Sequence, residues 1–204
     1  NGKMVWHYQF VHHDLWDYDP PAAPALVTVR RDGKERPAVV QLTKMGLVFI
    51  LNRLTGAPLF PVNEEAVPAS DVPGESAWPK KPVPVLPPPL SRSSMTADDL
   101  SNVPPESHQF CSELFATLVN KGRYTPYGLH PTLVLPGTLG GATWSGVSYN
   151  PALGYVFVNT NEVGAVGRLA PQPEGSPSAY KRTSDGGEYA RSWEKQLWPC
   201  QKPP

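Results

Sequence analysis

The feature that most constrains the fold of this chain is a series of short β-type runs separated by turn residues. Most of the runs are bounded by Gly, Pro, Asn or Asp, which end regular structure and favour tight turns. The six runs are Met4–Phe10, Ala25–Val29, Pro37–Leu42, Leu47–Asn52, Thr132–Leu135 and Tyr155–Asn159. This pattern predicts an all-β protein with tight turns.

Composition indicates an ordered, loop-rich protein. The 204 residues include 26 Pro and 17 Gly, but also 6 Trp, 8 Tyr and 6 Phe. Disordered chains lack such aromatic residues and apolar runs.

The charge of the chain is balanced. The 18 Lys and Arg residues balance 18 Asp and Glu residues, so no net field attracts nucleic acid or an anionic membrane. We therefore expect a neutral small-molecule partner and no nucleic acid.

Three stretches interrupt the β pattern. Residues 61–90 contain nine prolines, and the run Pro82–Pro89 predicts polyproline-like backbone in a surface excursion between strands. Thr96–Leu100 is typical of a helix start, and the apolar spacing in Glu106–Lys121 predicts one amphipathic helix. Residues 164–192 are rich in Gly, Pro, Ser and charge, and we expect a long loop there.

Two segments, residues 1–6 and 54–60, echo one another because each places a turn glycine a few residues before an aromatic side chain. The separation of Gly2 and Gly56 slightly exceeds the roughly 40–50 residue period of propeller blades. One pair of echoes fits an antiparallel sandwich about as well as a propeller. Periodicity therefore predicts the class and leaves the fold open.

The densest group of ionisable and aromatic residues lies in the segment Val11–Pro21. Metal binding is one interpretation, but the adjacent pair His12-His13 cannot face a single site from an extended strand. A general base is a second, because a carboxylate beside aromatic rings is desolvated and becomes a stronger proton acceptor. In a third, Trp16 docks into a groove while Asp14 and Asp19 cap turns. The pattern alone leaves these interpretations open.

An ordered series of motifs resembles the quinoprotein dehydrogenases, which use pyrroloquinoline quinone. The motifs are HHDLWDYD (residues 12–19), KMGLVFILNRLTG (44–56), FCSELF (110–115), YTPYGLHPTLVLPGTLGGATWSGVSYNP (124–151) and CQKPP (200–204). The first motif is most similar to the branch that contains membrane-bound glucose dehydrogenase. The resemblance implies part of an eight-bladed β-propeller with a short helical insertion.

The resemblance assigns the role of catalytic base to one residue of the first motif. The Asp that follows the Trp in the family motif is the base, and it corresponds to Asp17 here. Asp14 and Asp19 are the neighbours most easily confused with it. Oxygen ligands suit Ca²⁺, so we also expect Asp17 to be a metal ligand.

The resemblance also assigns cofactor contacts. Lys44 matches the basic residue that hydrogen-bonds the reactive quinone carbonyl in the family. The alternative is an ordinary turn lysine, whose side chain would be solvated. The loop Gly140–Gly146 resembles one that approaches the quinone edge, so we expect Thr143 and Trp144 to contact the cofactor. Relatives often have Asn near Thr143, and packing between blades is the alternative role of Trp144.

The function implied by this resemblance is oxidation of a sugar, glucose or another aldose, or of an alcohol, by hydride transfer to pyrroloquinoline quinone. Ca²⁺ or Mg²⁺ would accompany the quinone, and a quinone or cytochrome would accept the electrons through parts of the protein outside this chain. A non-enzymatic propeller scaffold is the alternative, since fold does not prove function. A scaffold has no reason to keep Asp17 and Lys44 together. A carbohydrate-binding sandwich would explain the aromatic residues but not the motif series.

We expect residues 1–204 to form a partial propeller domain that is incomplete at both ends and inactive alone, with loop-rich insertions at 61–105 and 164–192. The chain has no apolar run of about 18 residues and no export signal. The resemblance implies a periplasmic protein anchored to the membrane by a segment absent from this chain. A bridge between Cys111 and Cys200 would suit an oxidising compartment, and two unpaired thiols are the alternative.

Overall fold

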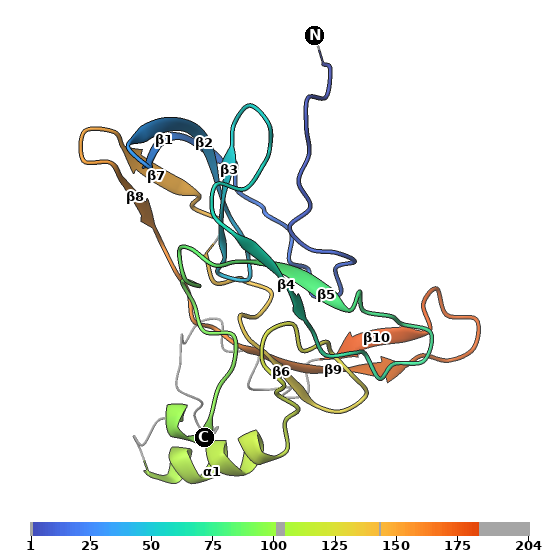
Figure 1. The fold of residues 1–204 in the computed structure, drawn as a ribbon. Coiled ribbons are helices and arrows are strands. Elements are labelled where there is room, and N and C mark those ends of the chain that lie inside the picture. Colours follow the sequence, from blue (N-terminus) through green and yellow to red (C-terminus); the bar gives the residue numbers. More distant parts are fainter. Residues whose placement is uncertain (1, 101–104, 143, 184–204) are drawn as a thin grey trace.

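The computed structural model describes residues 2–100, 105–142 and 144–183, and these residues form mostly antiparallel β-structure (Figure 1). The elements are β1 (Ala25–Arg31), β2 (Lys34–Leu42), β3 (Val48–Asn52), β4 (Val62–Ala66), β5 (Lys80–Pro84), the 3₁₀ turn η1 (Ala97–Asp99), α1 (Pro105–Ala116), β6 (Thr132–Val134), β7 (Val147–Asn150), β8 (Tyr155–Val158), β9 (Ala165–Pro171) and β10 (Tyr180–Thr183). The all-β prediction with one short helix is confirmed.

The strands form four small sheets, ordered β1-β2-β3, β10-β9-β6, β4-β5 and β7-β8. Figure 1 shows β1–β3 and the β7–β8 hairpin at one end, β6, β9, β10 and α1 at the other, and β4–β5 between them. The β1–β2 hairpin turns at Asp32-Gly33, where both residues have positive φ, as a two-residue hairpin loop requires. Within the described ranges, no helix is long and apolar enough to cross a bilayer.

Strand β3 separates the two main groups of buried apolar side chains. Successive side chains of a strand point to opposite faces of the sheet. Val48 and Ile50 therefore pack with side chains of β1, β2, β7 and β8. Phe49 and Leu51 pack on the other face with a group of buried rings that we call the aromatic cluster, which consists of Trp16, Tyr18, Phe49, Tyr124 and Tyr127. The motif of residues 12–19 is thus anchored in the core.

Residues 4–10 are not a strand, contrary to the prediction. Their alternation is real, because Trp6, Tyr8 and Phe10 pack against the aromatic cluster. The indole nitrogen of Trp6 donates a hydrogen bond to the carbonyl of Arg53, 3.0 Å away. No described segment pairs with this backbone, and a strand needs a partner for its hydrogen bonds.

The prediction of a loop at residues 164–192 is wrong for residues 165–171 and for residues 180–183, which form β10. Residues 165–171 form β9, which pairs with β6 on one side and β10 on the other. A central position of this kind allows tertiary pairing to override a weak local pattern. Residues 184–192 lie outside the described ranges.

The proline-rich excursion is also more regular than predicted. Pro82 and Pro84 are buried in β5, which pairs with β4. A proline lacks the backbone donor that a central strand needs, so it is tolerated on an edge strand. Because β5 is paired on one side only, its other edge requires no donors from these prolines.

The helical insertion is confirmed but is shorter than predicted. Thr96 precedes η1, and its backbone N–H and its hydroxyl both donate to the carboxylate of Asp99, at 2.7 Å and 3.1 Å. Helix α1 ends at Ala116 instead of continuing to Lys121. Its last turn tightens, and the chain then leaves to form a parallel bridge between Val119 and Thr132.

Cys111, on α1, is disulfide-bonded. Among the described residues no cysteine is free. Cys200, the other cysteine of the sequence, lies outside the described ranges. The interpretation of Cys111 as an unpaired thiol is therefore wrong.

We expect Gly56→Ala to destabilise the full-length protein more than Gly33→Ala. Both glycines have positive φ, 73° and 71°, so either alanine strains the backbone. Only at Gly56 would the added Cβ clash, 2.7 Å from the ring of Trp6, whereas Gly33 has nothing within 4 Å. Overpacking adds about 1–3 kcal/mol, and calorimetric thermal midpoints measure the difference. Equal midpoints would contradict the packing of Trp6 against this turn.

Candidate active site

The segment of residues 16–19 alternates buried aromatic residues with exposed carboxylates. Trp16 and Tyr18 are each 1% exposed and belong to the aromatic cluster. The side chains of Asp17 and Asp19 are 66% and 55% exposed. The backbone forms a turn here, with a positive φ at Asp17, so the buried rings set these directions and strand geometry does not. Burial of the two rings therefore directs both carboxylates to the surface.

Side-chain hydrogen bonds hold this segment in place. The indole nitrogen of Trp16 donates to the carbonyl of Thr125 at 2.9 Å, and the hydroxyl of Tyr18 donates to the carbonyl of Pro136 at 2.5 Å. The carboxylate of Asp14 accepts the backbone N–H groups of Trp16 at 2.9 Å and Tyr18 at 2.6 Å. Asp14 is thus a turn-capping residue, as the third sequence interpretation expected. Asp17 lies between the two capped amides and has a φ of 65°.

A tight turn after β2 positions Lys44. The hydroxyl of Thr43 donates to the carbonyl of Leu47 at 3.1 Å and accepts the N–H of Leu47 at 3.2 Å. Gly46 closes the turn with a φ of 73°, and its N–H donates to the carbonyl of Thr43 at 3.0 Å. The side chain of Lys44 is only 3% exposed. The interpretation of Lys44 as a solvated turn lysine is therefore wrong.

The ammonium of Lys44 forms ion pairs with both exposed carboxylates. Its Nζ lies 3.0 Å from Oδ2 of Asp17 and 2.6 Å from Oδ1 of Asp19. Burial lowers the pKa of Lys44, but the hydrogen bonds and charges of Asp19 and Asp17 outweigh burial and raise the pKa above its ordinary value. Lys44 is consequently a cation at neutral pH. The contact to Asp19 is one that the resemblance did not assign.

The loop of residues 137–146 meets the Lys44 turn through close backbone contacts. The N–H of Gly141 donates to the carbonyl of Lys44 at 2.7 Å. A Cβ on Gly46 or Gly141 would lie 1.9 Å or 2.0 Å from the hydroxyl oxygen of Ser91. Ser91 therefore occupies the gap between the two glycine turns, and both glycines are required by this contact. No sequence signal pointed to Ser91.

Trp144 completes the arrangement. Its indole is 63% exposed, although its N–H donates to the carbonyl of Leu139 at 2.9 Å. The φ of Trp144 is 54°, a conformation that costs such a residue about 1–3 kcal/mol. Nζ of Lys44 lies 5.6 Å from the centroid of the ring, within reach of a cation–π contact. Thr143, the other residue assigned to this loop, lies outside the described ranges.

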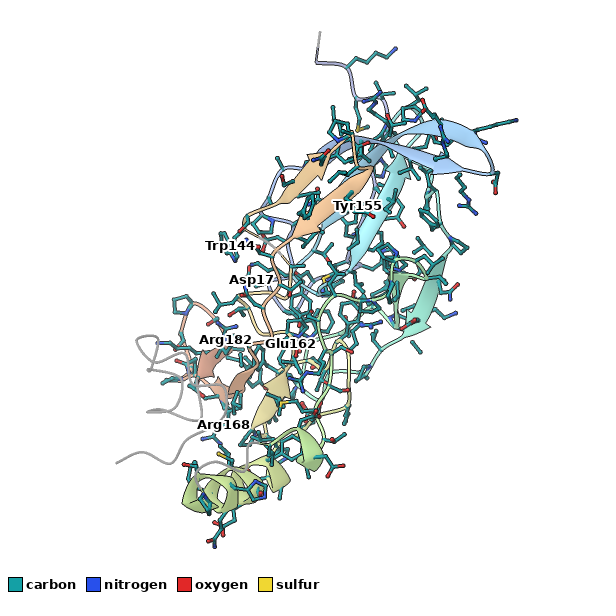
Figure 2. All side chains as sticks on the ribbon, turned by 90° about the vertical axis from the view of Figure 1, so that its left-hand side faces the viewer. Asp17, Trp144, Tyr155, Glu162, Arg168 and Arg182 are labelled. Atoms are coloured by element: carbon teal, nitrogen blue, oxygen red, sulfur yellow. The ribbon has the colours of Figure 1, made fainter. Side chains whose placement is uncertain are left out.

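Three of the four assigned residues therefore converge on one face. Figure 2 shows Asp17 and Trp144 at neighbouring positions beneath the β7–β8 hairpin, and Nζ of Lys44 is in contact with both side chains. The face combines an exposed aromatic plane, a fixed cation and two carboxylates. This set can stack a flat ring, donate a hydrogen bond to an anionic oxygen and accept a proton.

The described residues do not by themselves form a metal site. Among the described residues, no group of three or more His, Cys, Asp or Glu side chains could hold an ion. The ring nitrogens of His12 lie 3.1 Å from Oε1 of Glu64 and 3.3 Å from Oε1 of Gln9. His12 is therefore engaged with side chains of its own surroundings, which argues against the local zinc interpretation of the histidine pair.

Comparison with known proteins supports the motif resemblance. The sequence model described as "PQQ: Glucose/ethanol/alcohol dehydrogenase, beta-propeller domain" matches residues 1–204. A quinate/shikimate dehydrogenase (quinone) of Acinetobacter baylyi is 36% identical over 92% of this chain and 23% of that protein. Quinoprotein glucose dehydrogenases of Gluconobacter oxydans and Escherichia coli are 37% and 31% identical over 86% and 91% of this chain, and over 22% and 23% of those proteins.

This chain thus spans less than a quarter of the length of the curated relatives that it matches. A solved structure of a quinohemoprotein alcohol dehydrogenase of Pseudomonas putida HK5 aligns with a TM-score of 0.49 and 20% identity, over 89% of this chain and 22% of that chain. The family match extends over every residue of the chain, including both turns that carry Asp17 and Lys44. The chain therefore belongs to the PQQ-dependent glucose/ethanol/alcohol dehydrogenase β-propeller family, of which it forms a partial propeller.

Proposed function

We propose that the protein containing this chain is a pyrroloquinoline quinone-dependent dehydrogenase that oxidises a sugar, glucose or another aldose, or an alcohol, with Asp17 as the general base. The observation that carries the proposal is the buried ammonium of Lys44 on Asp17. It holds Oδ2 of Asp17 at 3.0 Å, and within the described residues no hydrogen bond engages Oδ1. Asp17 is thus oriented, exposed and able to accept a proton.

The named activities of the relatives support this substrate class. They include quinate/shikimate, glucose and glycerol dehydrogenases. Glucose and glycerol are both neutral, hydroxyl-rich compounds, in agreement with the balanced charge of this chain. A substrate hydroxyl group is the common reacting group, and its proton must go to a base during oxidation. Glucose is the first substrate to test.

The exposed face fits a flat, oxygen-rich quinone. The indole of Trp144 offers an apolar plane, and the ammonium of Lys44 offers donors for a quinone oxygen as negative charge develops on it. Pyrroloquinoline quinone, when bound, supplies the two-electron oxidant for the hydride of the substrate. Asp17 accepts the hydroxyl proton, and Lys44 keeps Asp17 oriented before that transfer. Thr143, beside Trp144 in the sequence, is proposed to contact the quinone as well.

Asp17 is also proposed as one shared ligand of a Ca²⁺ or Mg²⁺ ion. Ca²⁺ takes 6–8 oxygen ligands, and the described residues offer only the pair Asp17 and Asp19 at this face, both already on Lys44. This donor set does not fit a complete ion site. The remaining ligands are proposed to come from other parts of the protein. Asp17 is proposed to accept the proton through its own carboxylate oxygens.

The periplasm is the proposed location of the full-length protein, with anchoring to the membrane and electron transfer to a quinone or cytochrome through segments outside this chain. The disulfide at Cys111 supports this location because disulfides persist in oxidising compartments. Two of the relatives are named as quinate/shikimate dehydrogenase (quinone) and probable quinate dehydrogenase (quinone), in agreement with a quinone acceptor.

We expect Asp17→Asn in the full-length protein, reconstituted with pyrroloquinoline quinone and Ca²⁺, to lower kcat with glucose by roughly 10²–10⁴. An amide cannot accept the hydroxyl proton, but it preserves the shape of the side chain. Dye reduction measures turnover, and fluorescence titration measures quinone affinity. The matched control is Asp19→Asn, which removes the other carboxylate of the same ammonium and should lower kcat much less.

The control also identifies the base. A larger loss in Asp19→Asn than in Asp17→Asn would overturn the assignment of the base. Quinone binding without turnover of glucose would direct the search to other hydroxyl substrates. Absence of quinone binding in the wild-type protein would favour the non-enzymatic scaffold.

Lys44→Met is expected to lower kcat by about 10²–10³ through loss of a fixed donor at a developing negative charge. It also leaves Asp17 and Asp19 facing each other without their cation. Lys34→Met, at the exposed start of β2, is the control for loss of one positive charge. Similar activity of the two variants would show that Lys44 has no part in the reaction.

A further inference from the structure

Lys81 is a second buried lysine beneath the motif of residues 12–19, and the family resemblance assigned it no role. It belongs to β5 and is 0% exposed. Its neighbour Lys80, on the same strand, is exposed. Full burial of an ammonium is costly unless hydrogen bonds or charges compensate. The contacts of Lys81 therefore require an explanation.

The ammonium of Lys81 binds the backbone at the start of the motif. Its Nζ donates to the carbonyl of His12 and lies 3.4 Å from the carbonyl of His13. It also lies 5.1 Å from the centroid of the Trp16 ring, in cation–π range. Among the described residues, Lys81 forms no ion pair, whereas Lys44 forms two. The ammonium of Lys81 is thus held by the carbonyl groups of His12 and His13 and by the ring of Trp16.

Asp14, which directly follows His13 in the same turn, supplies the opposite charge. Its carboxylate accepts the N–H groups of Trp16 and Tyr18 on either side of Asp17. Burial lowers the pKa of Lys81, and the charges of Asp14 and Glu64 oppose that lowering. A cation on carbonyl oxygens and an anion on amide groups therefore fix the backbone before and after the candidate base.

We propose that Lys81 is a positioning residue that holds the turn of residues 12–18 in the conformation that presents Asp17 to Lys44. The proposal rests on the proposed role of Asp17 as general base. The motif is then held between two lysines. Lys81 binds its carbonyl oxygens and a ring on the buried side, and Lys44 binds its carboxylates on the exposed side.

Stability alone is a poor reason for a lysine at this position. A buried ammonium must first offset its own desolvation through its hydrogen bonds before it adds any stability. Methionine has a similar length and fits an apolar site, so Lys81→Met removes the ammonium and keeps the packing, although the carbonyl of His12 loses this donor. A loss of function in this variant would therefore report on the geometry of the turn.

The first experiment is a double-mutant cycle in the full-length, quinone-loaded protein with glucose as substrate. We expect Lys81→Met to lower kcat by about 10²-fold, the cost of a small misplacement of a reacting group, with unchanged quinone affinity. In the Asp17→Asn background the same substitution should cause no further loss, because residues that act through one group are not additive. Lys80→Met, the neighbour on the same strand, should leave kcat unchanged.

A conservative variant separates positioning from folding. The amide of Lys81→Gln keeps hydrogen-bond donors for the carbonyl of His12, so we expect a smaller loss of kcat than in Lys81→Met. If Lys81→Met is fully active, or its loss adds to that of Asp17→Asn, the positioning role is wrong. Full activity of Asp17→Asn itself would instead refute the proposed base, which distinguishes the two failures.

Hydrogen exchange followed by mass spectrometry tests the same inference without turnover. We expect Lys81→Met to lose amide protection in the peptide that covers residues 12–18, while the β1–β3 sheet keeps its protection. Protection of residues 12–18 in Lys81→Gln should lie between that of the wild-type protein and that of Lys81→Met. Unchanged protection of residues 12–18 in Lys81→Met, or an equal loss throughout the protein, would overturn the proposal whether or not the enzyme turns over glucose.

Discussion

The ion pairs of Lys44 with Asp17 and Asp19 are the interaction on which the candidate site depends. Two carboxylates at neighbouring alternate positions would repel each other at this face, and the ammonium between them removes that repulsion. The cation is buried although both of its partners are exposed. Its position is therefore set by the protein core, and the positions of the carboxylates follow from it.

The core achieves this through rings on the inner side of the same segment. Trp16 and Tyr18 are buried in the aromatic cluster and hydrogen-bonded to distant carbonyl groups. The turn that carries Lys44 is joined to the loop of Trp144 by a backbone hydrogen bond, with Ser91 between the two glycines. Three segments that are far apart in the sequence thus meet at one exposed face, and each is fixed by buried contacts.

Prediction from the sequence succeeded where local pattern and tertiary pairing agree. Strands β1, β2, β3, β6 and β8 were predicted within a few residues of their bounds. It failed at residues 4–10, where alternation occurs without a described partner strand, and at β9, where two partner strands stabilise a weak pattern. At β5 it failed because prolines are acceptable at an unpaired edge.

The sequence by itself determined the all-β class, because short β-type runs recur along the chain, and the family, because its ordered motifs are read along the chain. The same motifs predicted Asp17 as the base and Lys44 as a cofactor contact. Only the tertiary structure decided that Lys44 is buried, that Asp19 shares it with Asp17, and that Trp144 lies over its ammonium. The structure alone also located Lys81 beneath the motif. The physical reason is that burial and ion pairing depend on which distant segments meet, and the meeting of these segments is decided by core packing and not by local pattern.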